Sequence, residues 1–211
     1  MPTPSTVVFD LGKVLVDFDY RIAARRIAAR STLSHDGVQH YLDHSPALLR
    51  YETGQLTRRD FFEKVRKTTG FSGTLAEFGR CFADIFTEIR PMVELHTALR
   101  NRGVPSYIFS NTNDLAVEHI RRHFAFYGDF DGYVLSYEVG AMKPDARIYE
   151  ALERRAGRRG SELLYLDDRP ENIAAGAARG WQVILHESPE KTRAAMEKLG
   201  VFIGGASSTS P

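Results

Sequence analysis

The chain has 211 residues, 43% of them hydrophobic, and a formal net charge of +1. This length supports one full core with a small accessory unit, or one larger domain. The balanced charge gives no global field that would draw the protein to nucleic acid or anionic lipid. No apolar run approaches the roughly 18 residues of a membrane span, and no basic, apolar signal segment opens the chain. We therefore expect a soluble cytoplasmic protein without nucleic-acid or membrane partners.

Short apolar runs predict the strands. The apolar residues are nearly continuous rather than alternating, which is typical of central parallel strands covered on both faces. These runs occupy residues 6–9, 104–109, 133–135, 163–167 and 182–185. Helical patterns separate them: Pro91 opens one before Gly103, residues 114–124 form another, and Pro144 and Pro170 open two more, before a last one at 189–199. This alternation predicts an α/β fold with a doubly wound, Rossmann-like parallel sheet.

Residues 18–90 break the alternation, because their patterns are helical only. Thr57 with Asp60, and Thr74 with Glu77, have the spacing of capping boxes before apolar helical stretches. A helical insert directly after the first strand is best interpreted as a cap over the strand ends. We expect a core of residues 1–17 and 91–200, a cap of residues 18–90, and a small, polar, disordered tail of residues 201–211. A monomer is the default, and a dimer through the cap stays open.

Polar residues follow the predicted strands at their carboxyl ends. Asp10, Ser110 and Asp168 each lie there, which is the edge where an open parallel sheet binds ligands. Lys143 lies in the loop after the strand at 133–135, near the start of the next helix, so it can reach the same edge. Asp167 precedes Asp168 directly, and adjacent acids at a strand end repel unless a cation binds them or one turns away.

These residue types point to phosphoryl chemistry assisted by magnesium. A phosphomonoester is a dianion, so it repels a bare carboxylate. Mg²⁺ removes that obstacle, because it is a hard cation usually held by one or two carboxylates together with phosphate and water. Asp10 and Asp168 suit this role, and Gly12 can offer its backbone carbonyl.

The remaining polar residues suit the transferred group. Ser110, with the amide of Asn111, can hydrogen-bond to the phosphoryl oxygens, and Lys143 supplies a fixed positive charge. Asp10 is then able to attack phosphorus and form an aspartyl phosphate, which water hydrolyses. We therefore interpret the strand-end residues as the parts of one catalytic site.

Four motifs in this order resemble those of the haloacid dehalogenase-like hydrolase superfamily. They are residues 9–17 (FDLGKVLVD), 109–112 (FSNT), 143–144 (KP) and 166–173 (LDDRPENI). The resemblance covers about residues 5–190, and the helical insert is similar to the type 1 cap of subfamily I. The first motif and the later acid pair are most similar to bacterial glucose-1-phosphatase-like members.

The resemblance implies a role for each motif residue. Asp10 would be the nucleophile, and Mg²⁺ would lie among Asp10, the Gly12 carbonyl and Asp168, with Asp167 as a second carboxylate on the metal side. The phosphate would contact Ser110, Asn111 and Lys143. The implied activity is that of a phosphoric monoester hydrolase acting on a small-molecule substrate.

One position departs from the family pattern. Most phosphatases of this superfamily have an acid two residues after the nucleophile, where this chain has Gly12. Losing such a general acid commonly costs about 10²–10⁴ in rate. Three outcomes are open. The enzyme is slow, the substrate has a good leaving group, or another acid takes the place of the missing one, such as Asp17, Asp19 or a cap residue. An anomeric hydroxyl is more acidic than an ordinary alcohol, so a sugar 1-phosphate would lose least.

Several other functions remain to be weighed. Dehalogenases of the superfamily lack the acid pair, and phosphoacceptor receiver domains have the reverse motif order. A phosphosugar mutase, or a non-catalytic phosphate-binding or partner-binding protein, remains the alternative to a phosphatase. The histidine pairs His40/His44 and His119/His123 have helical spacing but no obvious third zinc ligand, and Cys81 is interpreted as a structural thiol.

Overall fold

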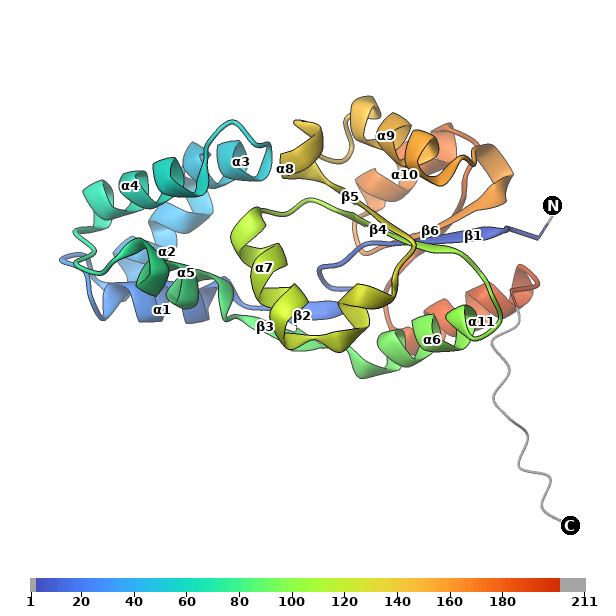
Figure 1. Cartoon of the computed structure of the whole chain (residues 1–211), viewed down its shortest axis with the longest axis horizontal. Helices are drawn as coiled ribbons and strands as arrows, with labels where there is room; N and C mark the ends of the chain where they lie inside the picture. Colours follow the sequence, from blue (N-terminus) through green and yellow to red (C-terminus); the bar gives the residue numbers. More distant parts are fainter. Residues whose placement is uncertain (1–2, 202–211) are drawn as a thin grey trace, which may run out of the picture.

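The computed structural model of the chain describes residues 3–201. Its centre is a parallel sheet of five strands in the order β5-β4-β1-β6-β7 (Figure 1). The strands are β1 (Thr6–Phe9), β4 (Ser106–Ser110), β5 (Gly132–Leu135), β6 (Leu163–Asp167) and β7 (Gln182–Leu185). The predicted doubly wound α/β fold is confirmed.

Helices cover both faces of this sheet. In β1, Val7 and Phe9 pack into one apolar cluster and Val8 into another, so successive side chains serve opposite faces. The first face is covered by α6 (Arg90–Arg100), α7 (Asp114–His123) and α11 (Pro189–Lys198), and the second by α9 (Ala146–Ala156) and α10 (Pro170–Ala178). Shorter turns are η1 (Ala125–Asp129), α8 (Ser136–Val139) and η2 (Gly160–Glu162). Burial on both faces explains the continuous apolar runs.

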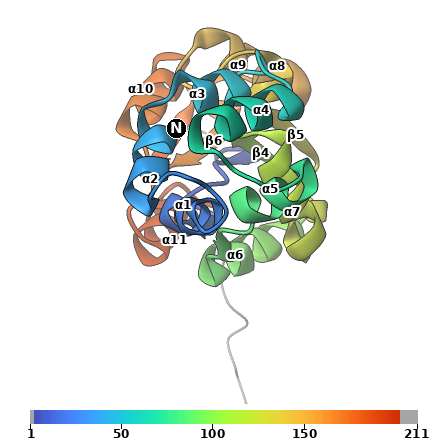
Figure 2. The same cartoon turned by 90° about the vertical axis from the view of Figure 1, so that its left-hand side faces the viewer.

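Five of the six helices between β1 and β4 form a second body with its own apolar core. They are α1 (Tyr20–Ala28), α2 (His35–His44), α3 (Pro46–Glu52), α4 (Arg58–Thr69) and α5 (Leu75–Ala83). Figure 2 looks onto these helices, which lie in front of the strands. Both expected capping boxes are present, at the starts of α4 and α5.

A short antiparallel ribbon joins this helical body to the sheet. It consists of β2 (Val16–Phe18) and β3 (Phe86–Glu88), and it was not predicted because each strand has only three residues. The predicted domain boundaries fall inside β2 and in the first turn of α6, and the division into core and cap stays a proposal. Val201, the first residue of the predicted tail, is 6% exposed; residues 202–211 lie outside the described part of the chain.

Two predicted elements begin two residues later in the structure, for local reasons. Strand β4, predicted from Val104, begins at Ser106, because the Val104 N–H donates back to the Leu99 carbonyl at the end of the preceding helix. The helix predicted from Pro144 begins at Ala146, because the Asp145 side chain caps it. Among residues 3–201, no helix is both long and apolar enough to cross a membrane.

Candidate active site

Asp10 stands at the carboxyl end of the central strand. Its N–H donates to the Leu166 carbonyl of β6 at 2.8 Å, which continues the sheet pairing by one residue and fixes the backbone. Its carboxylate accepts the Leu11 N–H at 2.7 Å. The residue is 8% exposed, so its carboxylate is largely withdrawn from bulk water.

Lys143 brings its charge to the same edge. Its Nζ lies 3.0 Å from the Asp10 carboxylate and 2.6 Å from that of Asp167, and it donates to the Phe109 carbonyl at 2.8 Å. Burial disfavours the ammonium, but the two carboxylates outweigh this and raise the pKa of Lys143 above its usual range. Lys143 is therefore a permanently charged group held by three acceptors.

The backbone of Lys143 is held by Asn111. The Asn111 side chain accepts the Lys143 N–H at 2.7 Å and donates to the Lys143 carbonyl at 3.0 Å. A contact of Asn111 with phosphate would therefore come from its main-chain N–H, while its side chain positions the lysine. Ser110, the last residue of β4, is 2% exposed and lines the same cavity.

Asp167 is fully buried, and donors surround its carboxylate. One oxygen accepts from the Arg169 N–H at 2.8 Å and the Asn172 amide at 3.0 Å. The other accepts from Lys143 and from the Tyr165 hydroxyl. Burial alone would raise the pKa of Asp167, but Lys143 and the hydroxyl hold it below its usual range. This arrangement favours a role in holding Lys143, and the predicted place of Asp167 on the metal stays a prediction.

Three carboxylates converge at this edge and can share a cation. One oxygen each of Asp10, Asp167 and Asp168 lies within 4.8 Å of the others. Lys143 neutralises only one of these charges, which leaves the group with an excess negative charge. Burial, followed by repulsion from Asp167, raises the pKa of Asp168, and burial likewise raises that of Asp10 despite Lys143. An all-oxygen donor set with excess negative charge fits Mg²⁺.

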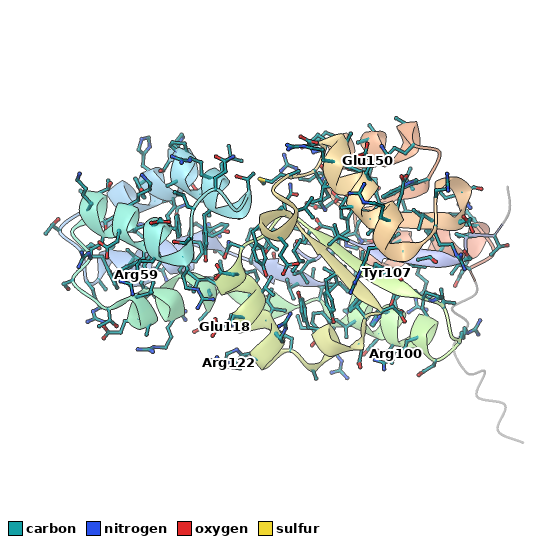
Figure 3. The ribbon with its side chains drawn as sticks, turned by 45° about the horizontal axis from the view of Figure 1, so that its top comes forward. Arg59, Arg100, Tyr107, Glu118, Arg122 and Glu150 are labelled. Atoms are coloured by element: carbon teal, nitrogen blue, oxygen red, sulfur yellow. The ribbon has the colours of Figure 1, made fainter. Side chains whose placement is uncertain are left out.

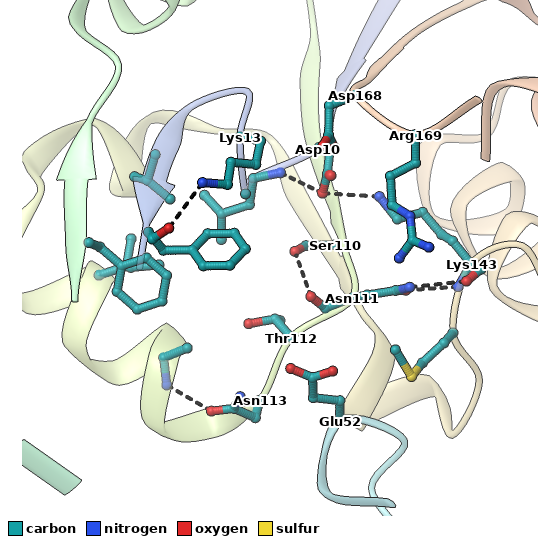
Figure 4. Close-up of a pocket in the computed structure, with 18 of the residues that line it drawn as sticks. Asp10, Lys13, Glu52, Ser110, Asn111, Thr112, Asn113, Lys143, Asp168 and Arg169 are labelled. Atoms are coloured by element: carbon teal, nitrogen blue, oxygen red, sulfur yellow. Dashed lines mark hydrogen bonds and ion pairs between the residues drawn. The ribbon is translucent and has the colours of Figure 1, made fainter. Parts of the chain in front are cut away.

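The carboxylates open into a cavity of about 240 Å³ between the sheet and the cap (Figure 4). Asp10, Ser110, Asn111, Lys143 and Asp168 line one side of it. Residues of the helical cap and of the β2–β3 ribbon complete its wall, among them Phe18, Tyr20, Leu48, Glu52 and Phe86. This volume lies below the range of about 300–1,000 Å³ typical of drug-sized ligands, so the cavity suits a small substrate.

The position of the absent family acid is filled by an aromatic ring. A Cβ added to Gly12 would lie 2.8 Å from Cε1 of the Phe18 ring, and Phe18 is the last residue of β2. A side chain at residue 12 therefore requires the ring to move.

The two nearby acids that were expected as substitutes are engaged elsewhere. Asp17 is exposed, accepts the Phe18 N–H and pairs with Lys13, which holds its pKa below the usual range. Asp19 caps α1, and its hydrogen bonds with Arg21 lower its pKa to about 2. Neither residue lines the cavity.

Sequence reasoning missed one acid of the cavity, Glu52. It is the last residue of α3, and only the packing of the cap brings it to the cavity. A glutamate followed by Thr53 and Gly54 carries no local signal for such a position. The two histidine pairs are not part of any potential metal cluster among the described residues, and burial raises the pKa of the Cys81 thiol.

The fold and the site together define a Rossmann-like hydrolase with an inserted helical cap and a carboxylate-rich site at the strand ends. A family model described as haloacid dehalogenase-like hydrolase matches residues 4–180. The chain therefore belongs to the haloacid dehalogenase-like hydrolases, as its motifs predicted.

Two proteins of similar length resemble the chain over most of its residues. D-ribitol-5-phosphate phosphatase of Bacteroides thetaiotaomicron is 24% identical, covering 86% of this chain and 91% of the relative. Phosphatase MT3486 of Mycobacterium tuberculosis is 25% identical, covering 96% and 98%. A crystal structure of a Bacteroides thetaiotaomicron family enzyme with magnesium and inorganic phosphate has a TM-score of 0.76 at 22% identity, over 86% and 93% of the two chains. The phosphatase names of these relatives agree with the predicted enzyme class.

Proposed function

We propose that this hydrolase is a magnesium-dependent phosphatase for a small phosphomonoester, and that it works through an aspartyl phosphate on Asp10. The observation that carries the proposal is the meeting of three carboxylates and one buried ammonium at the carboxyl edge of the sheet. The relatives named as phosphatases, and the related enzyme crystallised with magnesium and phosphate, support the same reading.

The residues divide the reaction between them. Asp10 attacks phosphorus, while the Ser110 hydroxyl and the Asn111 N–H hydrogen-bond to the phosphoryl oxygens. Lys143 supplies positive charge where negative charge gathers in the transition state. Asp10, Asp168 and the Gly12 carbonyl would hold Mg²⁺, which neutralises the phosphate and lets a carboxylate approach it.

A sugar or polyol phosphate is the substrate class that we favour. The cavity is small, and polar groups from the core and the cap share its wall. Without an acid at Gly12, an anomeric phosphate offers the easier leaving group, so a sugar 1-phosphate is the first candidate. A relative that acts on D-ribitol 5-phosphate supports the polyhydroxylated class.

The test is phosphate release from a panel of phosphomonoesters, with and without Mg²⁺, by the native protein and by Asp10→Asn. Metal-dependent release that the substitution abolishes supports the proposal, and the best substrate names its class. An isomeric sugar phosphate in place of free phosphate would instead support a mutase. Binding of Mg²⁺ and phosphate without turnover would support a non-catalytic protein.

A further inference from the structure

We propose that Glu52 is the general acid and base of this active site, and that it does from the cap what the family acid does from the position of Gly12. The inference rests on the proposed phosphatase function. It begins from an elimination among the acids that line the cavity, which are Asp10, Asp168 and Glu52. The first two belong to the carboxylate cluster, so Glu52 alone is left for proton transfer.

The side chain approaches the cavity from the side opposite the nucleophile. Figure 4 shows the Glu52 carboxylate reaching in from the cap toward the segment that carries Ser110, Asn111 and Thr112, with Asp10 beyond it. Asp10 attacks phosphorus in line with the leaving oxygen, so that oxygen points away from Asp10. The leaving group is therefore directed to the part of the cavity that Glu52 lines.

Two polar residues that line the cavity act on the carboxyl group. The Asn113 side chain, which accepts the Ala116 N–H at the start of α7, lowers the pKa of Glu52 from the core side. The second is Tyr20, at the start of α1, which lowers the pKa of Glu52 from the cap side. The surroundings of Glu52 therefore include one polar residue of the core and one of the cap.

The cap segment around Glu52 is docked firmly on α7. The Tyr51 hydroxyl donates to the Asp114 carboxylate and accepts the Leu115 N–H at 3.3 Å. Arg58 pairs with Asp114 at 2.8 Å and with Glu118 at 2.7 Å. Figure 3 shows Glu118 on α7 beside the cap helices. These contacts fix the end of α3 against the helix that follows the Ser110 strand.

The neighbouring Gly54 seats the same loop on the core. Its φ is +68°, and an added Cβ would meet the Tyr137 carbonyl oxygen of α8 well inside van der Waals contact. Only glycine allows the loop to lie so close to that backbone. The close approach keeps the residues after Glu52 at the rim of the cavity.

Its surroundings suit Glu52 to proton transfer at neutral pH. The residue is only partly exposed, and burial raises its pKa to about 7, against the opposing effects of Asn113 and Tyr20. A general acid works best with a pKa near the working pH. The charged groups that share the cavity are Lys13, Lys143, Arg169, Asp10 and Asp168.

The two steps balance in protons. In the first, a bond forms between an Asp10 oxygen and phosphorus, the bond from phosphorus to the leaving oxygen breaks, and that oxygen takes the proton of Glu52. In the second, the Glu52 carboxylate removes a proton from water as the water oxygen attacks the aspartyl phosphate. The bond from phosphorus to Asp10 then breaks, inorganic phosphate leaves, and both residues regain their starting states.

The test uses two substrates that differ in their need for an acid. Any sugar hydroxyl, the anomeric one included, is a poorer leaving group than 4-nitrophenolate, which 4-nitrophenyl phosphate releases as a stable anion. Glu52→Gln keeps the size and the hydrogen-bond acceptor of the side chain. Glu63→Gln, a cap residue of α4 that pairs with Arg66, is the matched control. Single-turnover rates isolate the first step, and a Mg²⁺-dependent thermal shift checks that each variant is folded.

We expect Glu52→Gln to slow the first step about 10²–10⁴-fold on the sugar phosphate and less than about tenfold on 4-nitrophenyl phosphate. We expect the native protein to lose rate above pH 7, and this loss should disappear in Glu52→Gln. Tyr20→Phe removes the hydroxyl that lowers the pKa of Glu52, so it should move that loss to higher pH. Glu63→Gln should change nothing.

Equal losses on both substrates, or a change confined to KM, would overturn the inference, because they would mean that Glu52 only binds substrate or supports the loop. An unchanged rate in folded Glu52→Gln would overturn it as well, and would leave the proposed function standing. A native protein that releases no phosphate from any substrate would overturn both.

Discussion

Replacing Lys143 with Met removes the charge between two buried carboxylates and keeps most of the side-chain length. Lys143 Nζ lies 2.6 Å from Asp167 and 3.0 Å from Asp10, and the Lys143 side chain is 1% exposed. Removing one partner of a buried ion pair typically costs about 3–5 kcal/mol, because the remaining charge is left unpaired. We expect Lys143→Met to lower the free energy of unfolding by about that amount at neutral pH with a chelator present.

The loss should depend on pH with a defined sign. Lys143 holds the pKa of Asp167 below its usual range, so this contribution is present above the unfolded pKa and disappears as the pH falls through the folded one. Without Lys143, the buried acids bind protons more readily than in the unfolded chain. The variant therefore becomes less stable, relative to the native protein, as the pH rises above the unfolded pKa of an aspartate, about 4.

Urea unfolding at several pH values in EDTA measures these differences. Lys191→Met is the matched control, because its ion pair with Glu187 is exposed and should be worth about 0–1 kcal/mol. Adding Asp167→Asn to Lys143→Met should recover part of the loss, since it removes one unpaired charge. A loss under about 1 kcal/mol, or one that does not change with pH, would refute the reasoning.

The other predictions concern the cap, the metal and a buried histidine. Gly54→Ala should raise KM and lower the free energy of unfolding by more than Gly103→Ala does. Gly103 has a similar φ of +72°, but no atom lies within 4 Å of its added Cβ. Equal effects of the two substitutions in urea unfolding and kinetics would contradict the close contact of the Gly54 loop with the core. EDTA should abolish phosphate release, and Mg²⁺ should raise the melting temperature of the native protein more than that of Asp168→Asn; equal shifts in thermal denaturation would argue against Asp168 as a ligand. Burial lowers the pKa of His96 to about 4, so on acidification the unfolded state binds the proton first and the free energy of unfolding falls between about pH 6.5 and 4. His96→Gln should flatten this part of the plot of unfolding free energy against pH. A slope equal to that of the native protein would contradict the prediction.

The sequence predicted the core site because topology alone brings its parts together. Asp10, Ser110 and Asp168 follow parallel strands of one sheet, and such strands end at the same edge. The local patterns were also sufficient for the capping boxes, whose two members lie three residues apart. These features depend on short-range spacing or on a general rule of sheet architecture.

Contacts between distant segments could not be predicted in the same way. The ribbon between the sheet and the cap pairs Val16–Phe18 with Phe86–Glu88, and three residues are too few to give a recognisable strand pattern. Glu52 reaches the cavity because Tyr51 docks on Asp114, 63 residues further along the chain. The sequence did not decide which acid of the pair Asp167-Asp168 faces a metal, for a similar reason. The Tyr165 and Asn172 side chains donate hydrogen bonds to Asp167, and only the folded chain brings these donors to it.

The proposed nucleophile Asp10 is fixed to the sheet, whereas the proposed proton donor Glu52 is carried by the cap. With these proposed roles, an opening of the cap would take the proton donor away from the phosphorylated aspartate and admit solvent at the same moment. Under the mechanism proposed above, an ester on Asp10 would then survive exposure to water until the cap shuts again. The time the cap stays open thus sets how long another hydroxyl has to compete with water for the phosphoryl group.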